Sequence, residues 1–145
     1  MYQHILIATD GSDLSARAVE HGVGLAHAVG AKVSFLTVTE SFHVFTLDAD
    51  QIEDSRLEFV EHMRTRAEQT LCAAGDVAQA RGVTFDTIHR EGDRPYEIIL
   101  EIAEAWRCDL IVMASHGRSG VSAMLLGSET MKVLTHSRRP VLVVR

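Results

Sequence analysis

Residues 4–12 read HILIATDGS, an apolar run that ends abruptly at Asp10, Gly11 and Ser12. An uninterrupted apolar run of this length is typical of a strand buried on both faces, as strands are in a parallel sheet. Asp, Gly and Ser directly after such a run are turn and helix-cap residues. The stretch therefore predicts a parallel strand that leads straight into a helix.

The rest of the chain repeats this alternation of strand and helix. The expected strands are residues 4–9, 32–38, 83–89, 109–113 and 140–144, and the expected helices are residues 13–29, 52–81, 95–106 and 127–136. An interruption of the second helix near Gly75 is left open, residues 39–51 form an irregular loop, and Trp106 is expected to anchor the core. Because strands separated by helices favour right-handed crossovers, the sequence predicts an α/β fold with an open five-stranded parallel sheet and helices on both faces.

Length and charge exclude several classes of function. The 145 residues fit one domain, residues 1–145, and the net charge is −6. This balance argues against nucleic-acid binding and against binding to anionic membranes, since both need a basic surface. The chain start lacks a targeting pattern, no apolar run reaches membrane-spanning length, and Cys72 and Cys108 have no pairing or zinc spacing. We therefore expect a cytoplasmic protein with reduced thiols.

Two segments at predicted strand ends carry polar residues suited to ligand chemistry. The first is residues 8–12, around Asp10, and the second is residues 115–120, which leads to Gly127 and Ser128 at a helix start. Ligands of open α/β sheets bind at the carboxyl ends of the strands, where the strand order reverses. If the first and fourth strands are neighbours, the two segments face each other across a crevice.

The second segment has the properties of an anion site. Glycines allow a close approach of backbone N–H groups, and a helix start attracts phosphate through its free N–H groups and positive dipole end. The groups that favour phosphate here are Gly117 and Gly120, the Gly127-Ser128 helix start, the hydroxyls of Ser119, Ser122 and Ser128, and the cationic side chains of Arg118 and His116. A glycine-rich surface turn followed by an ordinary helix cap is the alternative that these residues leave open.

Asp10 also has two interpretations. It is either a turn former or a partner for ribose hydroxyls or for a phosphate-bound Mg²⁺ ion. Other nucleotide motifs are missing: the chain has no G-x-x-x-x-G-K-[ST] and no G-x-G-x-x-G after the first strand, and it lacks the G-x-S-x-G elbow of α/β-hydrolases. Its eight histidines are scattered without metal-ligand spacing.

Residues 113–144, MASHGRSGVSAMLLGSETMKVLTHSRRPVLVV, resemble the C-terminal signature of the universal stress protein family. ATP-binding members of that family carry G-x-x-G, nine residues, and then G-S or G-T. In this chain the pattern is Ala114 to Gly117, residues 118–126, and then Gly127-Ser128, so alanine replaces the first glycine. Residues 4–26, VSFLTV at residues 33–38 and the turn from Glu91 to Pro95 also match, and the resemblance covers essentially the whole chain.

The resemblance implies an adenine nucleotide alpha hydrolase-like sheet with strand order 3-2-1-4-5, and it implies ATP and Mg²⁺ as ligands. It implies that Asp10 contacts ribose or metal, that the backbone near Val38 meets adenine, and that Ala8 and Thr9 line the base. The direction of the Glu129 side chain, which suits a helix start but would repel phosphate, is left open. Together, pattern and resemblance give as candidate nucleotide-binding residues Ala8, Thr9, Asp10, Val38, Ala114, His116, Gly117, Arg118, Gly120, Gly127, Ser128, Glu129 and Thr130.

The resemblance further implies a regulatory homodimer of the stress response, in which residues 141–144 pair with their copy and a regulatory protein of unknown identity is the partner. An exposed apolar edge strand needs covering, which is consistent with that pairing. Two alternatives remain. One is slow ATP hydrolysis or self-phosphorylation, for which His116 is the one candidate base. The other is an interaction module that binds no nucleotide, which only Ala114 supports, because alanine would be strained there if the position needs a positive φ.

Overall fold

A computed structural model describes residues 1–43, 49–118 and 125–145. Strands and helices alternate through these residues without exception. The elements are β1 (His4–Ala8), α1 (Asp13–Val29), β2 (Lys32–Thr39), α2 (Ala49–Ala80), β3 (Phe85–Glu91), α3 (Pro95–Ala105), β4 (Leu110–Ala114), α4 (Ser128–His136) and β5 (Val141–Val144). The predicted alternation of strand and helix is confirmed.

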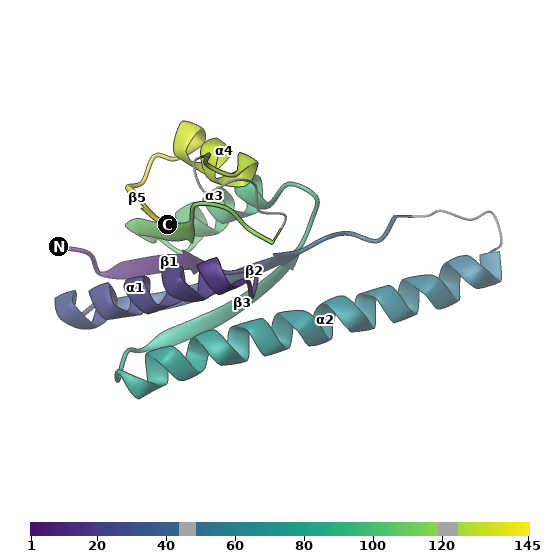
Figure 1. Cartoon of the computed structure of the whole chain (residues 1–145), viewed down its shortest axis with the longest axis horizontal. Coiled ribbons are helices and arrows are strands. Elements are labelled where there is room, and N and C mark those ends of the chain that lie inside the picture. The colour runs from purple at the N-terminus through teal and green to yellow at the C-terminus, as the bar shows by residue number, and fades with distance from the viewer. Residues whose placement is uncertain (44–48, 119–124) are drawn as a thin grey trace.

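The strands form one parallel sheet in the order β3-β2-β1-β4-β5. Helices α1 and α2 cover one face, and α3 and α4 cover the other (Figure 1). Side chains of β1 alternate between the two cores: Ile5 and Ile7 pack under α1 and α2, whereas Leu6 packs under α3. The predicted sheet, its strand order and its helices on both faces are therefore confirmed, and the order reverses between β1 and β4.

Helix α2, strand β3 and one core residue differ from the sequence prediction. Helix α2 begins at residue 49, inside the expected loop, and continues through Gly75. A Cβ on Gly75 would lie 2.8 Å from the Phe85 ring, so this glycine gives room for β3 rather than ending the helix. Strand β3 starts two residues late, since Val83 is still tied to the helix end by its N–H bond to the Ala78 carbonyl.

The prediction that Trp106 anchors the core is wrong. Its side chain is 38% exposed, because Trp106 is the C-cap of α3 and follows the last residues of that helix that pack on the sheet, Ile102 and Ala103.

Helix α2 is much longer than the sheet is wide. Figure 1 shows its N-terminal half, in blue, extending beyond the strands together with the chain that leaves β2. Its buried residues begin only at Ala67, so residues 49–66 have none. None of the helices in the described parts of the chain combines the length and apolar character needed to cross a bilayer.

Candidate functional site

The two segments singled out from the sequence meet at the carboxyl end of the sheet. Strands β1 and β4 are neighbours, with Ile7 opposite Val112. The Arg118 N–H donates to Asp10 Oδ2 at 2.9 Å, and Arg118 Nε donates to the Asp10 carbonyl at 2.8 Å. The predicted crevice between the strand ends is thus bridged directly by Asp10 and Arg118.

Two glycines make this bridge sterically possible. A Cβ on Gly117 would lie 2.6 Å from Asp10 Oδ2, and a Cβ on Gly127 would lie 3.0 Å from His116 Cα. The Gly127 N–H also donates to the Ser115 carbonyl at 2.7 Å. Asp10, Gly117, His116 and Gly127 therefore form one continuous set of close contacts from β1 to the start of α4.

The Asp10 carboxylate is held in its ionised form. Burial alone would raise the pKa of Asp10, but hydrogen bonds from Ser12, Ser15 and the Arg118 backbone outweigh it and hold the pKa below its usual range. The Ser12 N–H donates to Asp10 Oδ1 at 2.9 Å. Since each carboxylate oxygen has two lone pairs, both can still accept a ligand hydroxyl or bind a cation.

The start of α4 leaves backbone donors open. Gly127 is the N-cap and has no side chain to accept from the helix. The first N–H groups of the helix, at Ser128 and Glu129, have no acceptor among the residues that the structure describes. Ser128 is exposed, so these donors and the helix dipole are accessible to an anion.

Glu129 points away from those donors. Its Oε2 accepts the Tyr96 N–H at 2.9 Å and thereby caps the start of α3, and its Oε1 lies 3.4 Å from Lys132 Nζ. The direction that the sequence left open is therefore toward α3, where the carboxylate has a structural partner.

Ala114 and Thr130 join α4 to the sheet. Ala114 is the last residue of β4, opposite Val144, and Arg107 is the one non-glycine residue with a positive φ in the described chain. Ala114 therefore has an ordinary strand conformation and no strain. Thr130 is 2% exposed, and its hydroxyl donates to the Ala114 carbonyl at 2.9 Å.

The residues expected around the base fall on two faces of the sheet. Ala8 and Val38 both pack against the core under α3 and α4, at the ends of adjacent strands. The Thr9 hydroxyl instead contacts the Ser15 hydroxyl of α1 at 3.1 Å, on the opposite face. The structure thus brings Ala8 and Val38 together and separates the Thr9 side chain from them.

His116 is half-buried, with Nδ1 3.3 Å from the Ser115 hydroxyl. Gly120, and with it Ser119 and Ser122, lies outside the described residues. Within the described ranges, no group of three or more His, Cys, Asp or Glu side chains is arranged to hold a metal. A cation at Asp10 would therefore need further ligands from a bound molecule or water.

Two residues outside the list of candidate nucleotide-binding residues also shape this end of the sheet. Gly11 has φ +79°, and a Cβ there would lie 2.7 Å from the Thr70 hydroxyl of α2. The D-G-S turn was a usable signal for Gly11. Thr70 lies inside a long polar helix, where nothing in the sequence marks which residues face the crevice.

Comparisons with known proteins agree on one family. Residues 1–145 match the Universal stress protein family. The chain is 36% identical to universal stress protein YxiE of Bacillus subtilis, with 100% of each chain covered. It superposes on the structure of hypothetical protein MJ0577 with a TM-score of 0.83 and 29% identity, covering 99% of this chain and 96% of that one. A universal stress protein in complex with cAMP gives a TM-score of 0.70 and 31% identity, covering 99% and 97%.

Proposed function

Because this chain belongs to the universal stress protein family, we propose that it binds ATP with Mg²⁺ at the carboxyl end of its sheet and acts in the cytoplasm as a regulatory homodimer of the stress response. The observation that carries the proposal is the continuous contact from Asp10 through Gly117 and His116 to Gly127. It joins an ionised carboxylate, which can accept from ribose hydroxyls, to a helix start whose N–H donors can bind phosphates.

In this proposal the parts of the crevice take different parts of the nucleotide. Ala8 and Val38 offer a half-buried apolar surface for the base, and the Asp10 carboxylate accepts from ribose or holds the metal. The backbone around Gly117 and Arg118 and the N–H groups that follow Gly127 bind the phosphates. Thr130 and Glu129 support the site through α4 and α3, because their polar atoms already have partners.

Two further observations favour nucleotide binding over an interaction module without a nucleotide. The cAMP complex shows that a protein 31% identical to this chain binds an adenine nucleotide. The alternative rested on strain at Ala114, and that residue has an ordinary strand conformation here.

The proposed homodimer uses the edge of the sheet. In the part of the chain that the structure describes, strand β5 pairs only with β4, and Leu142 is 38% exposed. A copy of β5 would cover both the apolar side chains and the unpaired backbone groups of this edge.

The proposal is tested by whether ATP stays bound during purification and by whether Mg²⁺–ATP raises the melting temperature. The purified protein is denatured and the released small molecules are identified by mass spectrometry, and the melting temperature is measured with Mg²⁺–ATP. We expect co-purified ATP, or a shift of about 5–10 °C when ATP exceeds the Kd about 100-fold. Asp10→Asn and Gly127→Val should both lose the shift, whereas Asp13→Asn, an exposed acid three residues away, should keep it. Undiminished shifts in both site variants would overturn the site assignment.

A further inference from the structure

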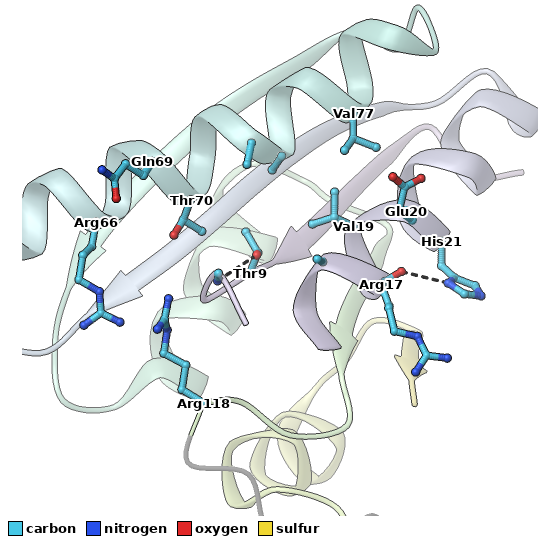
Figure 2. A pocket seen from close by; sticks show the side chains of 14 residues that line it. Thr9, Arg17, Val19, Glu20, His21, Arg66, Gln69, Thr70, Val77 and Arg118 are labelled. Carbon is cyan, nitrogen blue, oxygen red and sulfur yellow. Dashed lines mark hydrogen bonds between the residues drawn. The ribbon is translucent and has the colours of Figure 1, made fainter. Parts of the chain in front are cut away.

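A second hollow lies on the opposite face of the sheet from Ala8 and Val38. It has a volume of about 560 Å³ and runs between α1 and α2 (Figure 2). This volume is within the range of small-molecule pockets. Its end reaches Thr9, Gly11 and Arg118, and its walls belong to the two helices. Neither Ala8 nor Val38 is among its described lining residues.

The walls of this α1–α2 cavity are mainly small and apolar. They are built by Ala16 and Val19 of α1 and by Ala73, Ala74 and Val77 of α2. Small side chains on both helices leave the space open, and the His21 imidazole is the one aromatic ring among the described lining residues. Such walls suit a hydrocarbon group, because removing apolar surface from water is favourable.

Three arginines stand around these walls in a chain whose net charge is −6. Figure 2 shows Arg66 of α2 and Arg118 reaching toward the same end of the cavity, where Gln69 and Thr70 also lie, while Arg17 stands at the other side. The guanidinium groups of Arg17 and Arg66 have no hydrogen-bond or ion-pair partner among the described residues.

The acidic group in the cavity wall does not supply the missing counter-charge. Glu20 is the one acidic residue among the described lining residues, and it is paired at 2.8 Å with Arg81, which lies outside the lining. The cavity therefore combines an apolar wall with two cations at its end: Arg66, which has no described partner, and Arg118, whose Nε bonds the Asp10 carbonyl. An anion with an apolar body complements both the wall and these cations.

We propose that the α1–α2 cavity binds a small amphiphile with one anionic head group, a carboxylate or a phosphate. The head group lies between Arg66 and Arg118, near Gln69 and Thr70, and the hydrocarbon lies against Val19, Ala74 and Val77. Arg66 supplies a charge-assisted hydrogen bond, which is stronger than a neutral one.

The binding experiment uses the full chain and four probes: decanoate, decyl phosphate, decanol and inorganic phosphate, each below its micelle concentration. Amide chemical shifts of ¹⁵N-labelled protein are followed during titration. We expect saturable shifts at Arg66, Thr70 and Val77 with decanoate or decyl phosphate, and the tighter of the two identifies the head group. Decanol and inorganic phosphate should each bind at least about tenfold more weakly, because one lacks the charge and the other lacks the apolar body.

Two matched pairs of variants test the assignment. Ala73→Trp fills the cavity from an exposed position of α2 and should abolish binding, whereas Ala80→Trp, exposed on the same helix outside the lining, should not. Arg66→Gln should weaken binding at least about tenfold, whereas Arg64→Gln, which removes a cation paired with Glu61, should leave it unchanged. Circular dichroism checks that each variant is folded.

No saturable shift with either anionic probe would overturn the proposal, as would undiminished binding in Ala73→Trp. Equal affinity for decanol and decanoate would overturn the anionic head group. The result is independent of the nucleotide proposal: Gly127→Val, which lies outside the cavity lining, should lose ATP and still bind the amphiphile.

Discussion

At the scale of single residues, one carboxylate oxygen connects the two sides of the crevice. Asp10 Oδ2 occupies the space where any residue other than glycine at position 117 would place its Cβ, and from there it accepts the Arg118 N–H. The carboxylate and the loop after β4 are consequently in contact before any ligand is bound, which lowers the entropy that binding must overcome.

Gly117→Ala tests this contact. The added methyl group would lie 2.6 Å from Asp10 Oδ2 and turn the carboxylate away from the Arg118 N–H. We expect a loss of about 1–3 kcal/mol in the free energy of unfolding, the range for a hydrogen bond to a charged group, and at least about tenfold weaker ATP binding. Urea melts and calorimetric titration measure the two. Gly24→Ala is the control, because its Cβ would meet only the movable Arg81 guanidinium. Unchanged ATP affinity in Gly117→Ala would contradict the role of the Asp10–Arg118 contact in binding.

His4 makes stability depend on pH. Burial and, secondarily, Lys32 lower the pKa of His4, which is 5% exposed with Nε2 2.8 Å from the Ser34 hydroxyl. Below about pH 6.5 this histidine is protonated in the unfolded chain, whereas in the folded protein it stays neutral until a lower pH. The contribution of His4 to the free energy of unfolding is therefore fully present above that pH. As the pH decreases further, the free energy of unfolding decreases by at most about 1.4 kcal/mol per pH unit from this group.

The measurement is the urea midpoint at about pH 7.5 and pH 5.5 for the wild type, His4→Gln and His62→Gln. His4→Gln should reduce the difference between the two pH values, although it is less stable at both. His62 is exposed on α2, and its replacement should leave the difference as in the wild type. Equal pH dependence in all three proteins would refute the role of His4.

At the scale of elements, α4 is connected on three sides. Gly127 ties its start to Ser115, Thr130 ties it to the end of β4, and Glu129 ties it to α3. A helix held in this way presents its free N–H groups at a fixed place, so a phosphate bound there requires little rearrangement.

Glu129→Ala tests whether Glu129 stabilises the fold through α3 or contacts the bound ATP. Loss of the acceptor for the Tyr96 N–H should lower the free energy of unfolding by about 0.5–2 kcal/mol, as for other helix caps. ATP affinity should stay the same or rise slightly, because a negative charge near the phosphates is removed. Glu101→Ala, on the exposed side of α3, is the control for both measurements. A variant with full stability and much weaker ATP binding would instead make Glu129 a ligand contact.

At the scale of the whole molecule, the sheet was predictable because it depends on local patterns. Apolar runs such as residues 4–9 and 109–113 mark strands wherever they lie, and the family resemblance supplied their order. What could not be predicted depends on contacts between distant residues. Gly75 lies within a continuous helix and leaves room there for the Phe85 ring. Trp106 is exposed because it follows Ile102 and Ala103, the last residues of α3 that pack on the sheet.

The candidate site divides in the same way. That the segment around Asp10 faces the segment after β4 was expected from the strand order, whereas the direct bond between Asp10 and Arg118 was not. The sequence could not show that Thr9 faces α1 or that Glu129 faces α3, because side-chain direction depends on which neighbours are present. The α1–α2 cavity had no sequence signal at all, since most of its lining consists of helix residues such as Ala73, Ala74 and Arg66 that belong to no motif.

The proposed dimer can be tested through the free edge of β5. The Pro140 carbonyl accepts from Ile111 of β4, and the Val144 carbonyl accepts from Ser115 directly after β4. By alternation, the backbone groups of Val141 and Val143 therefore point to the free edge. Val143→Pro removes a free-edge N–H without breaking the pairing with β4. Light scattering after size exclusion should change from dimer to monomer in Val143→Pro and not in Val143→Ala. A wild type that is monomeric at high concentration, or a Val143→Pro variant that stays dimeric, would exclude this edge as the interface.

Residues 49–66 of α2 have no buried side chain. Their described contacts are ion pairs within the helix, such as Arg56–Glu53 and Arg64–Glu61, and one ring contact of Phe59 with Phe42, whose centroids lie 5.6 Å apart. A helical segment of this length is only marginally stable by itself in water. Its backbone amides should therefore open and exchange with deuterium without unfolding of the rest, at least about 100-fold faster than those of residues 68–80. One continuous helix would then consist of two parts that open at different rates. Residues 49–66 would fold and unfold while the sheet remained intact.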